Sequence, residues 1–253
     1  MSKDKKEKQK YKIILKSEQK QFTFKVIEMP GFKRQYQIMN KINMISRYKH
    51  IFFDFDGTLC ASEPDIRNGW KNTMAAMGLE NPDFDRIFQV GPSLPDMTAK
   101  LFPELSAEKQ QEIVLCFKRL YDTSDLPLTK PYPWIPDWLN ELKSAGCKLY
   151  IVTNKRKIPT DFLVRKFNWD KLLSGAYSPD SFEGETLGKT QLLNRVLEMH
   201  SIPRDQAVMV GDTVGDIKAG KANNTATVGV LWGYGNTGEV ENSSCDYILS
   251  EKE

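Results

Sequence analysis

The chain has 253 residues, 40% of them hydrophobic, and a net charge of +3, so it can bury one sizeable core and a smaller appended domain. No segment approaches the roughly 18 apolar residues of a membrane span, and the first residues lack the apolar run of a signal peptide. The four cysteines are far apart without a CxxC pair, which argues against a zinc cluster and favours reduced thiols in a cytoplasmic protein.

The basic charge belongs to an N-terminal extension, residues 1–43. Residues 1–50 contain 14 Lys and Arg against 4 Asp and Glu, whereas the rest of the chain is acidic. Such a run of lysines can bind nucleic acid or an anionic membrane, but it is more often a solvated tail. Two β-like runs, 11–15 and 22–27, predict that the extension holds a small hairpin or is partly disordered. Met44 precedes the first strong strand, so residues 1–43 are interpreted as dispensable or as an upstream misassigned start.

Four short apolar runs are typical of buried parallel strands. They occupy residues 50–54, 148–153, 207–211 and 226–231. Because helical patterns separate them, we predict an α/β fold with a doubly wound parallel sheet and right-handed crossovers. In such sheets ligands bind at the carboxyl ends of the strands, where polar residues follow these runs.

The first two runs are about ninety residues apart, far more than a simple crossover needs. Apolar residues from Ile66 to Met77 repeat at helical spacing up to Gly78, a C-cap candidate, and 113–121 forms a second apolar helical face. These patterns predict a small inserted α-helical cap domain. The predicted division is 44–61 and 132–253 for the core and 62–131 for the cap.

Two carboxylates, Asp54 and Asp56, stand two residues apart just past the first strand. In a tight loop this spacing can aim both side chains at one ligand, and Gly57 lets backbone N–H groups approach a phosphate closely. Two further acids, Asp212 and Asp216, follow the third strand, where acids also cap helices. The arrangement points to phosphoryl chemistry.

The motifs at the strand ends follow one another in a recognisable order. Asp54-Phe-Asp-Gly-Thr-Leu59 comes first, then Thr153, Lys189 and finally Gly211-Asp-Thr-Val-Gly-Asp216. These segments resemble, in this order, the four motifs of the haloacid dehalogenase (HAD) superfamily of hydrolases. The resemblance covers about residues 50–249 and implies a Rossmann-like core. Together with Pro131-Tyr-Pro133, the pattern looks most like the phosphoglycolate phosphatase branch.

The resemblance assigns a role to each motif residue. It implies that Asp54 is the nucleophile that forms an aspartyl-phosphate, and that Asp56 protonates the leaving alcohol and later activates water. Thr153 and Lys189 would hold phosphoryl oxygens, with Asn154 as a helper. The implied activity is a phosphatase for a small phosphorylated metabolite, such as phosphoglycolate, a nucleotide or a sugar phosphate.

The resemblance also implies a Mg²⁺ site. Asp212 would bind the metal with Asp54 and the backbone carbonyl of Asp56, and Asp216 would complete or orient the ligand shell. A site made of a few carboxylates, phosphate and water suits Mg²⁺, a hard cation that keeps several of its waters.

Three alternative functions share parts of this pattern. A phosphomutase of the same superfamily would keep all these residues, and a HAD-like scaffold could instead use the basic extension to bind nucleic acid or another partner. A P-loop NTPase is disfavoured because only three residues separate Gly184 from Gly188, where that loop needs four. The oligomeric state and the ester itself are left open by the sequence.

Overall fold

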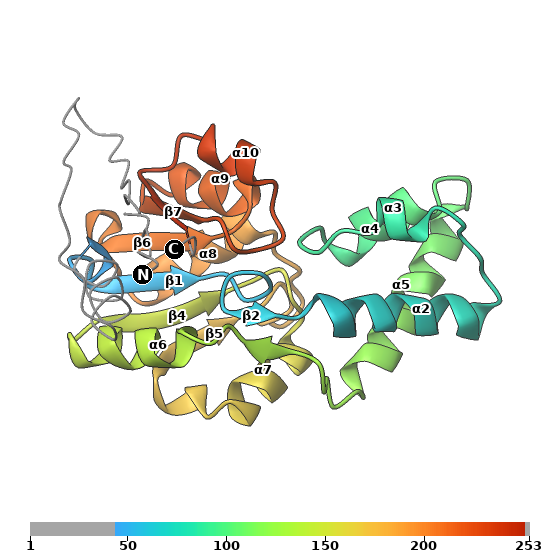
Figure 1. Ribbon diagram of the computed structural model, residues 1–253, viewed down its shortest axis with the longest axis horizontal. Helices are drawn as coiled ribbons and strands as arrows, with labels where there is room; N and C mark the ends of the chain where they lie inside the picture. Colours follow the sequence, from blue (N-terminus) through green and yellow to red (C-terminus); the bar gives the residue numbers. More distant parts are fainter. Residues whose placement is uncertain (1–43, 251–253) are drawn as a thin grey trace, which may run out of the picture.

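A six-stranded sheet forms the centre of the protein, whose computed structural model describes residues 44–250 (Figure 1). The strand order is β5-β4-β1-β6-β7-β8, and every pair is parallel. The strands are β1 His50–Phe53, β4 Lys148–Val152, β5 Leu173–Tyr177, β6 Ala207–Gly211, β7 Ala226–Val230 and β8 Tyr247–Leu249. The predicted doubly wound α/β sheet is therefore confirmed. The predicted hairpin and the rest of residues 1–43 lie outside the described residues.

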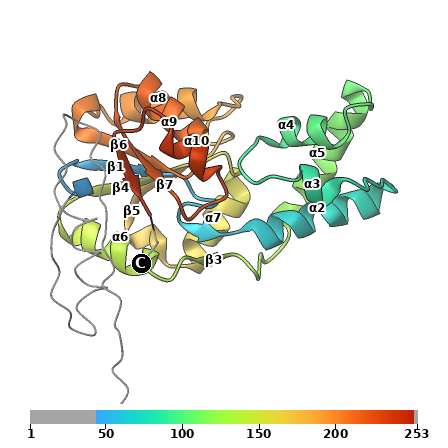
Figure 2. The ribbon, with the colours of Figure 1, turned by 45° about the horizontal axis from the view of Figure 1, so that its top comes forward.

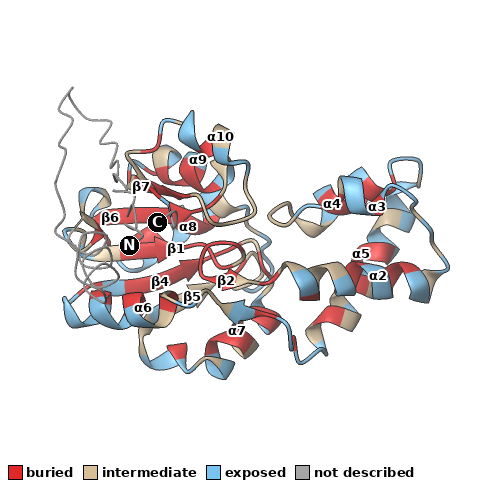
Figure 3. Ribbon diagram, viewed as in Figure 1, coloured by how far each residue is buried: buried red, intermediate tan, exposed pale blue. Residues whose placement is uncertain are grey.

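The sheet is buried on both faces because alternate side chains point to opposite sides. Phe52 packs with the side chains of one face and stacks on Tyr150 at 4.9 Å, whereas Ile51 and Phe53 belong to the opposite face. Helices cover both sides, and the strands form the buried centre in Figure 3. The covering helices are α6 Ile135–Ser144 and α7 Lys157–Lys166 on one face, and α8 Lys189–Met199 and α9 Val214–Ala222 on the other.

The remaining elements of the core are short. They are the helix α10 Thr237–Glu241 and the 3₁₀ turns η1 Trp169–Lys171 and η2 Arg204–Gln206. Within the described part of the chain, no helix combines the length and apolar character needed to cross a membrane.

A helical cap is inserted between the first two core strands and lies to one side of the sheet (Figures 1 and 2). The chain enters it after β2 (Cys60–Ala61) and leaves through β3 (Lys130–Pro131), and these two strands pair antiparallel. The cap helices are α2 Glu63–Met77, α3 Phe84–Ile87, α4 Leu94–Leu101 and α5 Ala107–Asp122. The predicted stop at Gly78 is present, since this residue caps α2 with a φ of 62°.

Aromatic packing joins the two long cap helices. The rings of Trp70 and Phe117 are 4.8 Å apart, and Phe117 stacks on Tyr121 at 5.1 Å. Gly69 allows this approach, because a Cβ there would lie 2.9 Å from the Tyr121 ring. The apolar stripes that predicted these helices thus meet where the two helices pack together.

The two crossings between core and cap are tied together by polar contacts. Asp65, near the start of α2, accepts hydrogen bonds from the backbone N–H groups of Leu128 (3.0 Å) and Thr129 (2.6 Å) on the return segment. The Tyr234 hydroxyl accepts from the N–H groups of Ser62 (2.6 Å) and Glu63 (2.9 Å). The start of the first cap helix is therefore attached to a loop of the core.

Candidate active site

Three carboxylates and one ammonium meet at the carboxyl edge of the sheet. Asp54 follows β1, Asp212 follows the adjacent strand β6, and Asp216 lies in the first turn of α9. One oxygen from each lies within 4.8 Å of the others, and all three residues are buried. Lys189, the first residue of α8, places its Nζ 2.8 Å from Asp54 Oδ1 and 2.5 Å from Asp216 Oδ1. The fold thus brings residues 54, 189, 212 and 216 together at this edge of the sheet.

Asp212 is held by the protein through both carboxylate oxygens. Its Oδ1 accepts from the Thr58 hydroxyl at 2.8 Å, and its Oδ2 accepts from the N–H groups of Tyr234 (2.8 Å) and Gly235 (3.2 Å). Gly57 has a φ of +84°, and a Cβ there would lie 2.4 Å from Asp212 Oδ2. A glycine is therefore required here for the approach of Asp212, a reason that the sequence did not reveal.

Asp216 caps a helix, which is one of the two roles that the sequence offered for it. Its Oδ2 accepts from the backbone N–H (3.0 Å) and hydroxyl (2.6 Å) of Thr213, which completes a capping box at the start of α9. Its Oδ1 faces Lys189. The residue therefore caps a helix and also presents a carboxylate oxygen to the site.

Burial controls the ionisation of this cluster. Desolvation raises the pKa of Asp54 to about 7, an effect that Lys189 opposes and that Asp216 and Asp212 reinforce. Burial likewise raises the pKa of Asp212 to about 6, with the charge of Asp216 adding to the shift. Burial alone would lower the pKa of Lys189, but Asp216 and Asp54 raise it above its ordinary value, so the ammonium stays charged.

The three acids fit a hard divalent cation. Lys189 is the one ammonium that ion-pairs with them in the described structure, so negative charge remains in excess when all three are ionised. Closely spaced buried carboxylate oxygens are ligands that Mg²⁺ prefers. The cluster could therefore hold such an ion.

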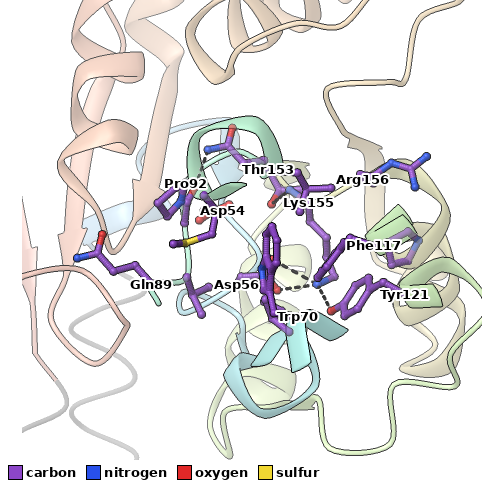
Figure 4. A pocket seen from close by; sticks show the side chains of 17 residues that line it. Asp54, Asp56, Trp70, Gln89, Pro92, Phe117, Tyr121, Thr153, Lys155 and Arg156 are labelled. Atoms are coloured by element: carbon purple, nitrogen blue, oxygen red, sulfur yellow. Dashed lines mark hydrogen bonds and ion pairs between the residues drawn. The ribbon is translucent and has the colours of Figure 1, made fainter. Parts of the chain in front are cut away.

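A pocket extends from this edge to the cap, and Asp56 lines it beside Asp54 (Figure 4). Thr153 also lines the pocket, buried at the end of β4, and its hydroxyl accepts from the Lys155 N–H at 3.1 Å. Asn154 lines it too, but its amide donates to the carbonyl of Gly91 in the cap at 3.0 Å. In this structure Asn154 therefore joins core to cap. The cap contributes mainly apolar side chains to the lining: Ile66, Trp70, Val90, Leu94, Met97 and Phe117.

Sequence reasoning missed three contributors to the site. Lys155 is buried and contacts the Asp56 carboxylate, although the sequence marked only its neighbours. Thr58 stands inside the first motif, yet nothing in the chain predicted its bond to Asp212. The Tyr121 hydroxyl reaches Lys155 at 2.9 Å from a helix whose apolar stripe marked it as core. For Lys155, its place directly after the second motif was the available signal.

Comparisons with known proteins agree with this geometry. Residues 51–230, which include every predicted site residue, match the family described as haloacid dehalogenase-like hydrolase. A phosphoglycolate phosphatase from Aquifex aeolicus is 35% identical over 190 residues, covering 73% of this chain and 85% of the relative. A 5'-nucleotidase from Pseudomonas aeruginosa is 25% identical over 195 residues, covering 77% and 87% respectively. The solved structure of a haloacid dehalogenase-like hydrolase from Streptococcus pneumoniae has a TM-score of 0.70 and 28% identity, covering 82% of this chain and 95% of that one.

Proposed function

This chain belongs to the haloacid dehalogenase-like hydrolase family, and we propose that it is a Mg²⁺-dependent phosphatase that hydrolyses a small phosphate monoester through an aspartyl-phosphate. Its relatives include enzymes named as phosphatases, and the chain is a phosphatase of this family. The observation that carries the proposed mechanism is the meeting of Asp54, Lys189, Asp212 and Asp216 beside a pocket that Asp56 also lines.

The first half of the reaction uses both acids of the first motif. A carboxylate oxygen of Asp54 forms a bond to phosphorus while the bond between phosphorus and the ester oxygen breaks. Asp56 gives its proton to the departing oxygen, so that a neutral alcohol leaves. Lys189 and Thr153 stand at the same edge, where they can hold the phosphoryl oxygens and offset their charge.

The second half returns the enzyme to its starting state. Asp56, now ionised, accepts a proton from water as the water oxygen bonds to phosphorus. The bond between phosphorus and the Asp54 oxygen then breaks, which releases inorganic phosphate and regenerates the carboxylate. The two acids thus divide the work into nucleophile and proton carrier.

The metal is proposed from the character of the acids. Asp54 and Asp212, with the backbone carbonyl of Asp56, would hold Mg²⁺, and Asp216 would complete or orient the shell; their buried oxygens suit that ion. When bound, Mg²⁺ supplies positive charge that offsets the charge on the phosphoryl group.

The substrate is proposed as a small phosphorylated metabolite. The relatives are named for phosphate esters of different alcohols, phosphoglycolate and a nucleotide, so phosphoglycolate, a nucleotide and a sugar phosphate are the esters to compare. We also propose a cytoplasmic location, supported by the four cysteines, which are all free thiols.

The test is phosphate release from a panel of these esters and p-nitrophenyl phosphate, with Mg²⁺ and with EDTA. Asp54→Asn keeps the shape of the side chain but removes the nucleophile, and we expect its kcat to fall by about 10⁴-fold or more. Asp161→Asn, on a surface ion pair, is the matched control. Trapping of an acid-stable, hydroxylamine-sensitive phosphoenzyme would identify the intermediate.

Three results would contradict parts of the proposal. Turnover in EDTA equal to turnover in Mg²⁺ would show that the reaction needs no metal. An active Asp54→Asn variant would show that the reaction does not pass through an aspartyl-phosphate on Asp54. If no ester releases phosphate while a sugar phosphate is isomerised, the enzyme is the phosphomutase that the same residues allow.

A further inference from the structure

The segment that follows Thr153 binds the cap at each of its next three residues. Asn154 donates to the Gly91 carbonyl at 3.0 Å, Lys155 contacts the Tyr121 hydroxyl, and Arg156 ion-pairs with Asp122 at the end of α5. The loop that ends β4 is thus one of the places where the core and the cap are joined by polar contacts.

Lys155 differs from its neighbours because it also contacts a proposed catalytic group. Its Nζ lies 3.0 Å and 3.3 Å from the two carboxylate oxygens of Asp56 and 2.9 Å from the Tyr121 hydroxyl (Figure 4). The Lys155 side chain is 3% exposed and the Asp56 side chain 12% exposed. A buried ammonium that contacts both oxygens restricts the rotation of the ionised carboxylate far more than an exposed pair would. When Asp56 takes up the proton that it passes to the alcohol, one of the two oxygens carries that proton and the other keeps the contact with Lys155.

We propose that Lys155 is a positioning residue, which sets the orientation of Asp56 for proton transfer, and that Tyr121 makes this orientation depend on the seated cap. The inference rests on the proposed role of Asp56 as proton carrier. When the cap moves away, Lys155 loses the Tyr121 oxygen and a fixed place for its ammonium. Asp56 is then no longer held, so proton transfer to the alcohol is efficient only while the cap covers the pocket.

The arrangement has a functional rationale. Proton transfer requires heavy atoms within about 3 Å, and small misplacements cost large factors in rate. A cap that also orients the proton carrier restricts catalysis to the closed pocket, where water is excluded. The cap contact made by Arg156 lies on the same loop and holds the Lys155 backbone beside the cap.

The test compares leaving groups in Lys155→Met, with Lys155→Arg and Tyr121→Phe beside it. The quantity measured is kcat/KM, because it reports the steps up to release of the alcohol, in which Asp56 is the acid. We expect Lys155→Met to lose about 10- to 100-fold on an alkyl phosphate such as phosphoglycolate, whose alcohol must be protonated. On p-nitrophenyl phosphate, whose leaving group departs without a proton, we expect a loss below about threefold.

The other variants separate positioning from simple packing. Tyr121→Phe keeps the ring, and we expect the same leaving-group pattern at a smaller size. The double variant should be no worse than Lys155→Met alone, because both changes interrupt one link. Lys155→Arg should recover part of the alkyl activity. Lys157→Met, two residues further on, removes an exposed lysine and should match wild type on both esters.

The outcomes distinguish this inference from the proposed function. If wild type releases phosphate from neither ester, the proposed function fails. If wild type is active and Lys155→Met loses equally on both esters, or loses nothing, the positioning role is wrong. Additive losses in the double variant would show that Tyr121 does not act through Lys155. A thermal melt of each variant identifies any loss that comes from unfolding.

Discussion

The carboxyl edge of the sheet holds its functional groups with hydrogen bonds and buried ion pairs, whereas the cap is held together mainly by aromatic packing. At the edge, Asp212 accepts from two backbone N–H groups and a hydroxyl, while the cap helices meet through Trp70 and Phe117. Fixed polar contacts keep charges in one geometry, as phosphoryl chemistry requires. Apolar packing is less directional, so a cap can change its lining while the edge keeps its chemistry.

The largest effect is expected from removing the cation at the edge. Lys189→Met leaves Asp54 and Asp216 buried without their ammonium, which should lower the free energy of unfolding by about 3 to 5 kcal/mol. Urea unfolding at pH 8 in EDTA measures this loss, and turnover should fall with it. Lys157→Met, at an exposed pair, should cost less than about 1 kcal/mol. Equal stability of the two variants would show that Lys189 does not offset the charge of the acids.

A cavity in the cap should have a smaller and more local effect. Phe117→Ala removes a buried ring from the centre of the cap, at a cost of about 3 kcal/mol. We expect faster hydrogen exchange in α2 and α5 and unchanged exchange in β1 and β6. Leu115→Ala on the same helix is the control, since Leu115 is 54% exposed. Equal loss of protection in the sheet would show that cap and core unfold as one unit.

Metal removal should lower the stability that the carboxyl edge of the sheet contributes and should leave the packing of the cap unchanged. At a Mg²⁺ concentration 100 times its dissociation constant, binding to the folded state adds about 2.7 kcal/mol of stability. Thermal melts with Mg²⁺ and with EDTA measure this difference. Asp212→Asn should remove most of it, and Asp161→Asn should retain it. An equal shift in Asp212→Asn would place the stabilising ion elsewhere.

The effect that is smallest for each step of one pH unit concerns the stability of the metal-free protein. The pKa of Asp54 rises from 3.8 to about 7 on folding, so the folded state binds a proton more tightly than the unfolded chain. The resulting stabilisation is complete below about pH 4 and is lost as pH rises through 7. Asp54→Asn has no such proton, and its stability relative to wild type should therefore rise between pH 4 and 7. The change is at most about 1.4 kcal/mol per pH unit.

Urea unfolding of both proteins in EDTA at several pH values tests this prediction. Asp161→Asn should keep the wild-type slope, because that carboxylate lies at the surface in an ion pair. A constant difference between Asp54→Asn and wild type across the range would show that Asp54 is already ionised when metal-free.

The strands with the clearest sequence signal were those buried on both faces. The runs that predicted β1, β4, β6 and β7 are nearly continuous in apolar residues, because helices cover both sides of these strands. The two edge strands were not predicted. β5 contains Gly175 and is only partly buried, and β8 has three residues, so neither shows a distinct apolar run.

The site shows the same division between local and distant information. Asp54, Lys189 and Asp212 each stand at the end of a strand or the start of a helix. Each belongs to its own short motif, which can be recognised from the neighbouring residues in the chain. Lys155 and Tyr121 are 34 positions apart and meet through the docking of the cap. Tyr121 has no local pattern that distinguishes a functional contact from ordinary packing, and the one local signal for Lys155 is its place directly after the second motif.

The sequence by itself determined the parallel sheet, the inserted helices and the acids at the strand ends, because periodicity and motif spacing are local properties of the chain. Only the tertiary structure decided that Lys189 lies between two acids, that Gly57 must lack a side chain beside Asp212, and that Lys155 joins Asp56 to the cap. These relations arise where separate elements pack together. Their physical basis is burial, which makes each charge depend on partners that are distant along the chain.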